Sequence, residues 1–405
     1  MTAAMQQNLA GQPYNICAHI KGIPVDFAWS IEQLEYKTAA IRFAQKELSE
    51  GVTEREQQGC FPHDQWGKCA DFGVLGLPFP EEYGGAAADI LTTMLVMEGL
   101  GYGGKDNGLL FALNAQMWAV QHPINEFGSS EQKARWLPRL IGGEIIGAHG
   151  MSEPDSGSDA YSLRTRAEVC AGGYRLNGTK TFVTNAPVAD LALVFASTAP
   201  EKGSWGISAF LVETGTPGFT VGKNIAKMGL RTAPMGELIL QDCFVPDANR
   251  LGPEGVGAHL FNSGMEWERA CILGAHVGAM ERQLEECVKY ARARKQFGQP
   301  IGKFQSISNR IAEMKVRLET ARLLLYKTAW LKKEGKPAQM EAAMTKLYLS
   351  EVFVESSLDA IRIHGGYGYT TEFEVERDLR DAIGGTLYSG TSDIQRNIIA
   401  RYLGL

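Results

Sequence analysis

Leu176-Asn177-Gly178-Thr179-Lys180 carries the clearest local signal for the central part of this chain. Its Asn-Gly pair stands between two strand-like segments, and this arrangement is the strongest short-range signal of a β-hairpin. Short β-branched and aromatic runs bounded by Gly, Asn and Pro continue on both sides, from residue 147 to residue 252. We therefore expect an antiparallel β-domain of about 100 residues in the middle of the chain.

The regions on both sides of this β-domain have helical periodicity instead. Residues 25–146 form an N-terminal helical domain in this interpretation, interrupted by a loop rich in Pro and Gly at 78–85. Residues 253–405 carry helical patterns long enough for a C-terminal four-helix bundle. The predicted fold class is therefore α+β, mainly α. Residues 1–24 have no clear period and are interpreted as an extension, either native or added for expression.

The composition is ordinary for a soluble globular protein, with 44% hydrophobic and 21% charged residues in 405. No apolar run approaches the roughly 20 residues of a membrane span, and no secretion leader is recognisable. We therefore expect a cytoplasmic protein without membrane contact. The seven cysteines include no C-x-x-C pair, so neither a disulfide framework nor a metal site is expected. A net charge of −6 with thinly spread Lys and Arg argues against a nucleic-acid surface.

Four stretches could bind a ligand, although each also has an ordinary structural explanation. The polar loop 152–159 could present backbone N–H groups to a phosphate, or it could be a simple turn. Phe182 and Thr184 share a strand face, where the ring could stack on a ligand or be buried. The basic segment 292–298 suits a pyrophosphate or a solvated helix end. The glycines of 364–369 permit close backbone approach, but glycine-rich turns are common.

Taken together and in order, these stretches resemble the acyl-CoA dehydrogenase family over residues 25–405. The resemblance implies FAD as the cofactor and a homotetramer as the assembly. The shared motifs are Pro-x-x-Tyr-Gly-Gly, Met-Ser-Glu-Pro-x-x-Gly-Ser-Asp, Gly-Thr-Lys-x-Phe-x-Thr-Asn, Arg-Lys-x-Phe-Gly, Gly-Gly-x-Gly-Tyr and Gly-Thr-Ser-x-Ile-Gln-Arg.

The resemblance also implies where the cofactor is held. Arg362 stands where family members usually have Gln, so the FAD contact at that position is not carried over. The expected contacts are Met151, Ser152, Phe182 and Thr184 at the isoalloxazine, with Thr184 near N5; Ser158 near the pyrophosphate; Arg294, Gln296 and Phe297 at the ADP portion of FAD in a neighbouring subunit; Gly365 and Gly366 by close backbone approach; and Thr391 and Asp393 at the opposite end of the site.

The C-terminal stretch 388–396, Tyr-Ser-Gly-Thr-Ser-Asp-Ile-Gln-Arg, departs from the family at one decisive position. Members usually read Tyr-Glu-Gly-Thr-Ser there, and that Glu is the catalytic base, whereas this chain has Ser389. A serine hydroxyl cannot remove a proton beside a carbonyl, so either the chemistry is lost or another residue is the base. One branch of the family places its base on an earlier helix, in a sequence resembling Gly-x-x-x-Glu-Arg. Residues 264–269 match it and give Glu268 as the candidate.

Helical geometry supports Glu268 independently of the resemblance. A helix would place Glu268 on an otherwise apolar stripe and turn Glu266 elsewhere. A carboxylate in apolar surroundings is expected to have a raised pKa, which makes it a competent base near neutral pH. The alternative is a structural Glu paired with an Arg from another helix. The stripe consists of Phe261, Met265, Glu268, Ile272 and Ala275.

The predicted function is FAD-dependent α,β-dehydrogenation of an acyl thioester. Glu268 would take the Cα proton while hydride leaves Cβ for flavin N5. Arg269, Tyr388 and Ser389 are the expected substrate-binding residues, and a Ser389→Ala change is expected to be mild. Tyr388-Ser389, residues 384–386 and the relocated base resemble members that oxidise a prolyl group on a peptidyl carrier protein.

Several other functions are compatible with the same sequence. The substrate could instead be a short or branched acyl-CoA, and oxidation could stop after one round or continue to a pyrrole. A flavin oxidase or monooxygenase on the same scaffold, a non-catalytic homologue that has lost its base, and a carrier-protein binding module without chemistry are the further alternatives. The electron acceptor is either oxygen or an electron-transfer flavoprotein.

Overall fold

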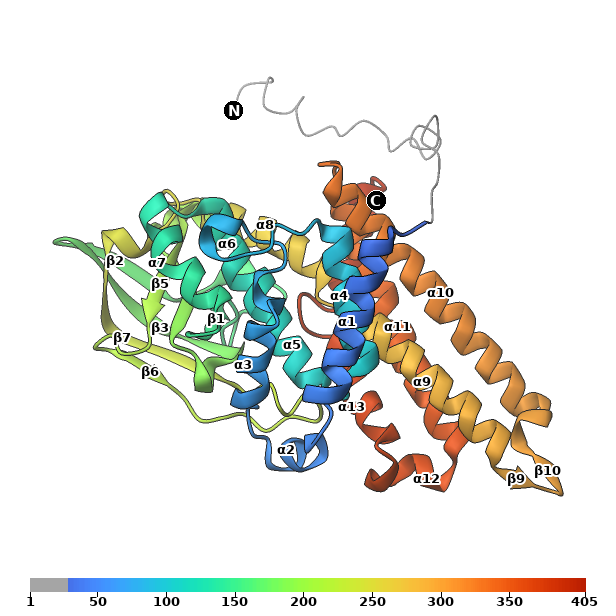
Figure 1. Ribbon diagram of the computed structural model, residues 1–405. Coiled ribbons are helices and arrows are strands. Elements are labelled where there is room, and N and C mark those ends of the chain that lie inside the picture. The colour runs from blue at the N-terminus through green and yellow to red at the C-terminus, as the bar shows by residue number, and fades with distance from the viewer. Residues whose placement is uncertain (1–27) are drawn as a thin grey trace.

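The computed structural model describes residues 28–405, which form three successive parts (Figure 1). Helices make up the first part, a β-sheet the second, and long helices the third. The predicted fold class, α+β with mainly helical structure, is confirmed. The extension expected at residues 1–24, and the predicted start of the fold near Val25, lie outside the described residues.

The N-terminal helices are α1 (Ile31–Glu47), α2 (Val52–Gln58), α3 (His63–Asp71), α4 (Ile90–Gly103), α5 (Asn107–Gln116), α6 (His122–Phe127) and α7 (Ser130–Ile141). Capping boxes begin two of them, formed by Ser30 with Gln33 at α1 and by Ser129 with Gln132 at α7. Most side chains of α4 are buried because it packs between α1 and a later helix, α9 (Gly274–Ala293).

The central part is a sheet of β1 (Gly147–Gly150), β2 (Arg166–Cys170), β3 (Gly173–Thr184), β4 (Leu191–Ser197), β5 (Ile207–Glu213), β6 (Phe219–Val221), β7 (Met235–Pro246) and β8 (Arg250–Leu251). The strand order is β6-β7-β3-β2-β4-β5-β8, and β1 pairs with β4. Most pairs are antiparallel as predicted, but β4 runs parallel to β1 and, at one residue pair, to β2. The prediction of an antiparallel β-domain was therefore wrong at β4, which lies parallel to β1 because the β2–β3 hairpin intervenes between them.

The predicted hairpin at Asn177-Gly178 was also wrong, because both residues lie inside β3. The chain turns instead at Ala171-Gly172, where Gly172 has a φ of +78°. Asn177 serves a different purpose. Its side-chain amide donates to Asp242 Oδ1 of β7 at 3.2 Å, and its Oδ1 accepts from the Asp242 backbone N–H at 2.8 Å. These bonds hold a β-bulge where the register of β3 and β7 shifts.

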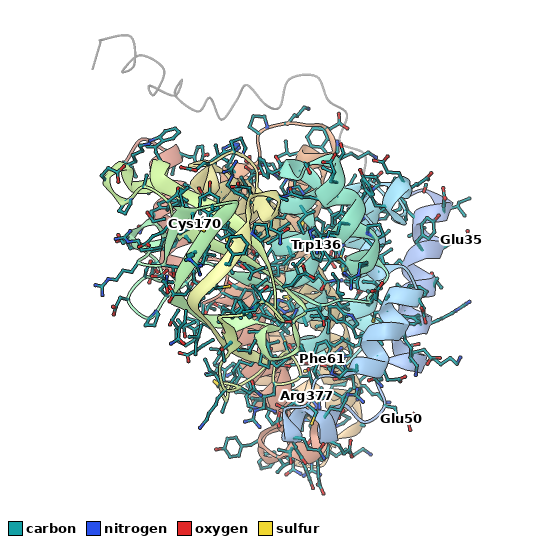
Figure 2. All side chains as sticks on the ribbon, turned by 90° about the vertical axis from the view of Figure 1, so that its left-hand side faces the viewer. Glu35, Glu50, Phe61, Trp136, Cys170 and Arg377 are labelled. Carbon is teal, nitrogen blue, oxygen red and sulfur yellow. The ribbon has the colours of Figure 1, made fainter. Side chains whose placement is uncertain are left out.

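The C-terminal helices are α8 (Gly257–Cys271), α9, α10 (Gln305–Lys333), α11 (Gln339–His364), α12 (Gly366–Tyr369), α13 (Val375–Gly385) and α14 (Ser392–Tyr402). Helices α9, α10 and α11 pack against one another and α13 packs on α11, in agreement with the predicted bundle. Arg377 of α13 donates to Thr53 Oγ1 of α2 at 3.2 Å. Figure 2 accordingly shows Arg377 and Glu50 at the same end of the molecule.

Helix α8 lies where the three parts meet. It packs against α6 of the N-terminal part, β5 of the sheet and α11 of the C-terminal part, and Figure 1 shows it between the sheet and the long helices. A side chain on the inner face of α8 is therefore surrounded by all three parts.

Within residues 28–405, no helix combines the length and apolar character needed to cross a membrane. The same residues contain no group of His, Cys, Asp and Glu arranged to hold a metal ion. The expected cytoplasmic location stays a prediction.

Candidate active site

Glu268 lies on the buried face of α8, as the helical spacing predicts. Only 8% of its surface is exposed, and Met265, one turn earlier on the same stripe, is also buried. Glu266 faces elsewhere and pairs with Lys332 of α10. Glu268 is therefore the single carboxylate on this stripe, because Glu266 lies on another face of the helix and pairs with Lys332 there.

The hydrogen-bond partner of Glu268 is Ser389, in the loop between α13 and α14. Ser389 Oγ donates to Glu268 Oε1 at 2.5 Å, whereas Oε2 is buried and has no hydrogen-bond partner among the described residues. No ion pair reaches Glu268 within residues 28–405, so the alternative of a Glu paired with an Arg from another helix does not match the structure. Arg269, the next residue of α8, donates from Nε to the carbonyl of Ser389 at 3.2 Å.

Opposing influences set the pKa of Glu268. Burial is the largest and raises the pKa, because a desolvated carboxylate favours its neutral form. The hydrogen bond from Ser389 and the positive charges of Arg269 and Lys346 lower it. Because burial prevails, the carboxyl is a stronger base than an exposed glutamate, and one of its two oxygens has no hydrogen-bond partner among the described residues.

Lys346 of α11 and Tyr388 complete this buried cluster. Lys346 is fully buried, its Nζ lies 5.9 Å from the centroid of the Tyr388 ring, and burial lowers the pKa of Lys346 to about 7. The Tyr388 ring packs on Phe111 of α5, with 4.4 Å between ring centroids. Neither Lys346 Nζ nor Tyr388 Oη has a hydrogen-bond partner in the described part of the chain.

Sequence reasoning found Tyr388 but missed Lys346. The signal was available, because Lys346 lies on a helical stripe that is mostly apolar. Ala342, Leu349 and Phe353 stand at i−4, i+3 and i+7 from it, and all are fully buried. An ionisable residue on an apolar face of a helix is a candidate site residue, and this holds for Lys346 on α11 as it does for Glu268 on α8.

The residues expected at an isoalloxazine lie on β3 and just after β1. Phe182 is 65% exposed and has a φ of +55°, in a second β-bulge between β3 and β7. This bulge directs the ring away from the sheet core, while Val183 beside it is buried and Thr184 is half-buried. Met151 is buried and Ser152 is half-buried, and the Ser152 carbonyl accepts the Thr181 N–H at 2.9 Å.

Three other expected cofactor residues lie on loops and at a helix start. Ser158 is exposed in the loop between β1 and β2. Thr391 caps α14, its Oγ1 accepting from the Ile394 N–H at 3.3 Å. Asp393, in the first turn of α14, is exposed and pairs with Arg396 at 2.9 Å.

The basic and glycine-rich groups lie together at the far end of the long helices. Arg294 ends α9, and its guanidinium lies 5.6 Å from the ring centroid of Tyr367, next to the Gly365-Gly366 turn. Gln296 belongs to β9 (Lys295–Gln296), which pairs with β10 (Gln299–Pro300), and Phe297 at the tip is 92% exposed. Arg362 pairs with Asp359 at 3.4 Å. Figure 1 shows β9 and β10 at the opposite end of the molecule from the sheet.

Family models for the three parts of acyl-CoA dehydrogenases match almost the whole chain. The N-terminal domain model matches residues 30–144, the middle domain model residues 148–243, and the C-terminal domain model residues 255–404.

Individual relatives are similar over a comparable length. An L-prolyl-[peptidyl-carrier protein] dehydrogenase of Pseudomonas fluorescens strain Pf-5 is 44% identical over 94% of this chain and 100% of the relative. The crystal structure of the prolyl acyl carrier protein oxidase AnaB has 51% identity and a TM-score of 0.92, over 93% of this chain and 100% of that one. A structure of PigA with FAD and proline has 43% identity and a TM-score of 0.92, over 94% and 100% of the two chains. This chain therefore belongs to the acyl-CoA dehydrogenase family.

Proposed function

We propose that this protein is an FAD-dependent dehydrogenase that oxidises the Cα–Cβ bond of an acyl thioester, and that its substrate is a prolyl group on a peptidyl carrier protein. The observation that carries the proposal is the buried carboxylate of Glu268, which keeps one oxygen free and stands opposite a serine at the usual position of the base. The similarity to prolyl-carrier-protein enzymes supports the choice of acyl group.

Glu268 carries the proton transfer in this proposal. Its free Oε2 accepts the Cα proton of the thioester, and its raised pKa makes it a stronger base than an exposed glutamate. The aromatic contact between Tyr388 and Phe111 forms an apolar wall that keeps water from the carboxylate. Bound FAD supplies the acceptor for the hydride that leaves Cβ.

The residues present fit FAD. A Phe at positive φ with most of its ring exposed, as at Phe182, is costly unless another surface covers it, and an isoalloxazine is such a surface. A Cβ added at Gly365 or Gly366 would meet no described atom within 4 Å, so a ligand can approach the backbone there. We propose Met151, Ser152, Ser158, Thr184, Gln296, Thr391 and Asp393 as the further cofactor contacts.

The separation of these contacts within one chain supports a shared cofactor. Phe182 lies on the sheet, whereas Arg294 and Phe297 lie at the far end of the helices (Figure 1). A cofactor that contacts both groups must therefore lie between subunits, and we propose a homotetramer. Light scattering of the purified protein should give a mass of about four chains, and a monomer that retains FAD would contradict the shared site.

Arg294→Ala should weaken FAD retention more than thioester binding, because a guanidinium and a pyrophosphate form charge-assisted hydrogen bonds. FAD content after dialysis, measured by absorbance, tests this. Lys289→Ala, an exposed cation of the same helix outside the segment 292–298, is the matched control for the loss of one positive charge. Equal FAD retention in the Arg294 variant and the parent would show that this end of the helix does not bind the cofactor.

An anaerobic titration tests the proposed function directly. Purified protein should be yellow, and its flavin should bleach with prolyl-carrier protein faster than with butyryl-, isovaleryl- or octanoyl-CoA. Bleaching only by an acyl-CoA would replace the proposed substrate, and no bleaching by any thioester would overturn the reaction. Reoxidation of the bleached protein by oxygen, compared with an electron-transfer flavoprotein, then separates an oxidase from a dehydrogenase.

A further inference from the structure

Ser389 is held in an unusual backbone conformation. Its φ is +56°, which is uncommon for a residue other than glycine. Its carbonyl accepts two hydrogen bonds, from Arg269 Nε of α8 and from Gln395 Nε2 of α14, both at 3.2 Å. Gln395 is fully buried and also donates to the Gly390 carbonyl at 2.8 Å. Two helices therefore fix the backbone of this one loop residue.

The fixed backbone places the Ser389 hydroxyl against one oxygen of Glu268. A hydrogen bond from a hydroxyl to an ionised carboxylate is charge-assisted and therefore stronger than a bond between two neutral groups. Glu268 Oε2 has no such partner among the described residues. The two oxygens of the carboxylate are thus not equivalent, since the protein occupies the first and leaves the second for the substrate.

We propose that Ser389 is a positioning residue whose hydroxyl fixes Glu268 Oε1 and leaves Oε2 as the oxygen that receives the Cα proton of the substrate. This inference rests on the proposed function, in which Glu268 is the base. The Cα proton moves to Oε2, the electron pair of the broken C–H bond stays with the substrate, and Ser389 keeps its own proton. The serine thereby orients the base that has moved to α8.

The hydroxyl also affects the pH at which the base works. The charged or titratable groups that face Glu268 are Arg269 from its own helix, Lys346 from α11 and Tyr388 from the loop. Among the protein groups that lower the pKa of Glu268, the hydrogen bond from Ser389 is the largest. Its removal should therefore raise the pKa further, so that the carboxylate forms only at higher pH.

Two variants of Ser389 separate the effect of losing the hydroxyl from the effect of relieving the backbone strain. Ser389→Ala removes the hydroxyl and keeps the strain of a Cβ at positive φ, whereas Ser389→Gly removes both. Ser49→Ala is the matched control, because Ser49 is a half-buried serine of the N-terminal part whose hydroxyl donates to the carbonyls of Ala44 and Gly103. For each holoprotein, anaerobic flavin reduction by prolyl-carrier protein is measured from pH 5.5 to pH 9, together with FAD content.

Both Ser389 variants should reduce flavin roughly 10- to 100-fold more slowly at neutral pH, since a hydrogen bond to a charged group is lost. The rising limb of the pH profile should move to higher pH, while FAD content and half-saturating substrate stay parental. Parental rates and midpoints in both variants, together with an inactive Glu268→Gln, would overturn the positioning role and leave the proposed base standing. An active Glu268→Gln would instead overturn the assignment of Glu268 as the base, and the positioning role of Ser389 with it, whereas only the absence of flavin bleaching by any thioester in the parent would overturn the proposed reaction.

Discussion

Helix α8 and the loop between α13 and α14 are joined by hydrogen bonds from Ser389 to Glu268 and from Arg269 to Ser389, and in our proposal they share the catalytic task differently from the usual pattern of the family. In the usual motif of the family, the loop carries the carboxylate. In this chain α8 carries a carboxylate, Glu268, and the loop carries the hydroxyl of Ser389. Both positions can deliver a side chain to the same point. If Glu268 is the base, as we propose, the comparison teaches that a base can lie on a different element of the same fold when the side chain at its usual position contacts it.

The largest expected effect comes from removing the base on the helix side. Glu268→Gln keeps the size and the hydrogen-bond acceptor for Ser389 but loses the basic oxygen. Flavin reduction in an anaerobic stopped-flow mixer should fall by roughly 10²- to 10⁴-fold, the usual contribution of a general base. FAD content should stay parental, which distinguishes this loss from unfolding. Reduction at nearly the parental rate would mean that the base is elsewhere.

A second variant returns the carboxylate to the loop. The double variant Ser389→Glu, Glu268→Gln should reduce its flavin roughly tenfold faster than Glu268→Gln alone, because the loop position lies within hydrogen-bond reach of residue 268. The recovery should be partial, since a larger side chain at a φ of +56° is strained. Ser389→Gln in the same background has the same size without a base and is the control. Equal rates in these two double variants would show that the loop cannot reach the substrate.

The smallest expected effect comes from Lys346, which faces both elements. Below pH 7 its amine is protonated, because its pKa is about 7, and its positive charge lowers the pKa of Glu268. Lys346→Met removes that charge, so fewer Glu268 carboxyls are ionised at pH 6 and flavin reduction should slow by roughly three- to tenfold. Above pH 8 the amine is neutral and the two rates should converge. A constant ratio at every pH would contradict the electrostatic role, and an unchanged melting temperature excludes misfolding.

The order of the three parts and the position of Glu268 could be predicted from the sequence, because both follow from local periodicity. The stripe on α8 depends only on helical spacing, and the helix forms as expected. The predicted hairpin at Asn177-Gly178 was wrong because an Asn-Gly pair favours a turn only where no neighbouring strand pairs with it. Asp242 of β7, 65 residues away, makes Asn177 part of a bulge. No pattern within the segment itself contains that information.

The contact between Ser389 and Glu268 could not be predicted for the same reason. The two residues are 121 positions apart, and the sequence by itself predicts only a mild effect of Ser389→Ala. The hydrogen bond, the positive φ and the two bonds to the Ser389 carbonyl depend on how α8, α14 and the loop pack together. The revised expectation for this variant therefore comes entirely from tertiary structure.

The most direct test of a base on α8 is the exchange of the Cα hydrogen, measured separately from hydride transfer. With the flavin of the holoprotein fully reduced by dithionite, no hydride can be accepted, and a base can only exchange the Cα proton with solvent. Prolyl-carrier protein incubated in D2O with this reduced protein is then analysed by mass spectrometry. We predict deuterium incorporation with the parent and an exchange rate at least roughly 100-fold lower with Glu268→Gln. Exchange by Glu268→Gln at the parental rate would contradict the assignment of Glu268 as the base.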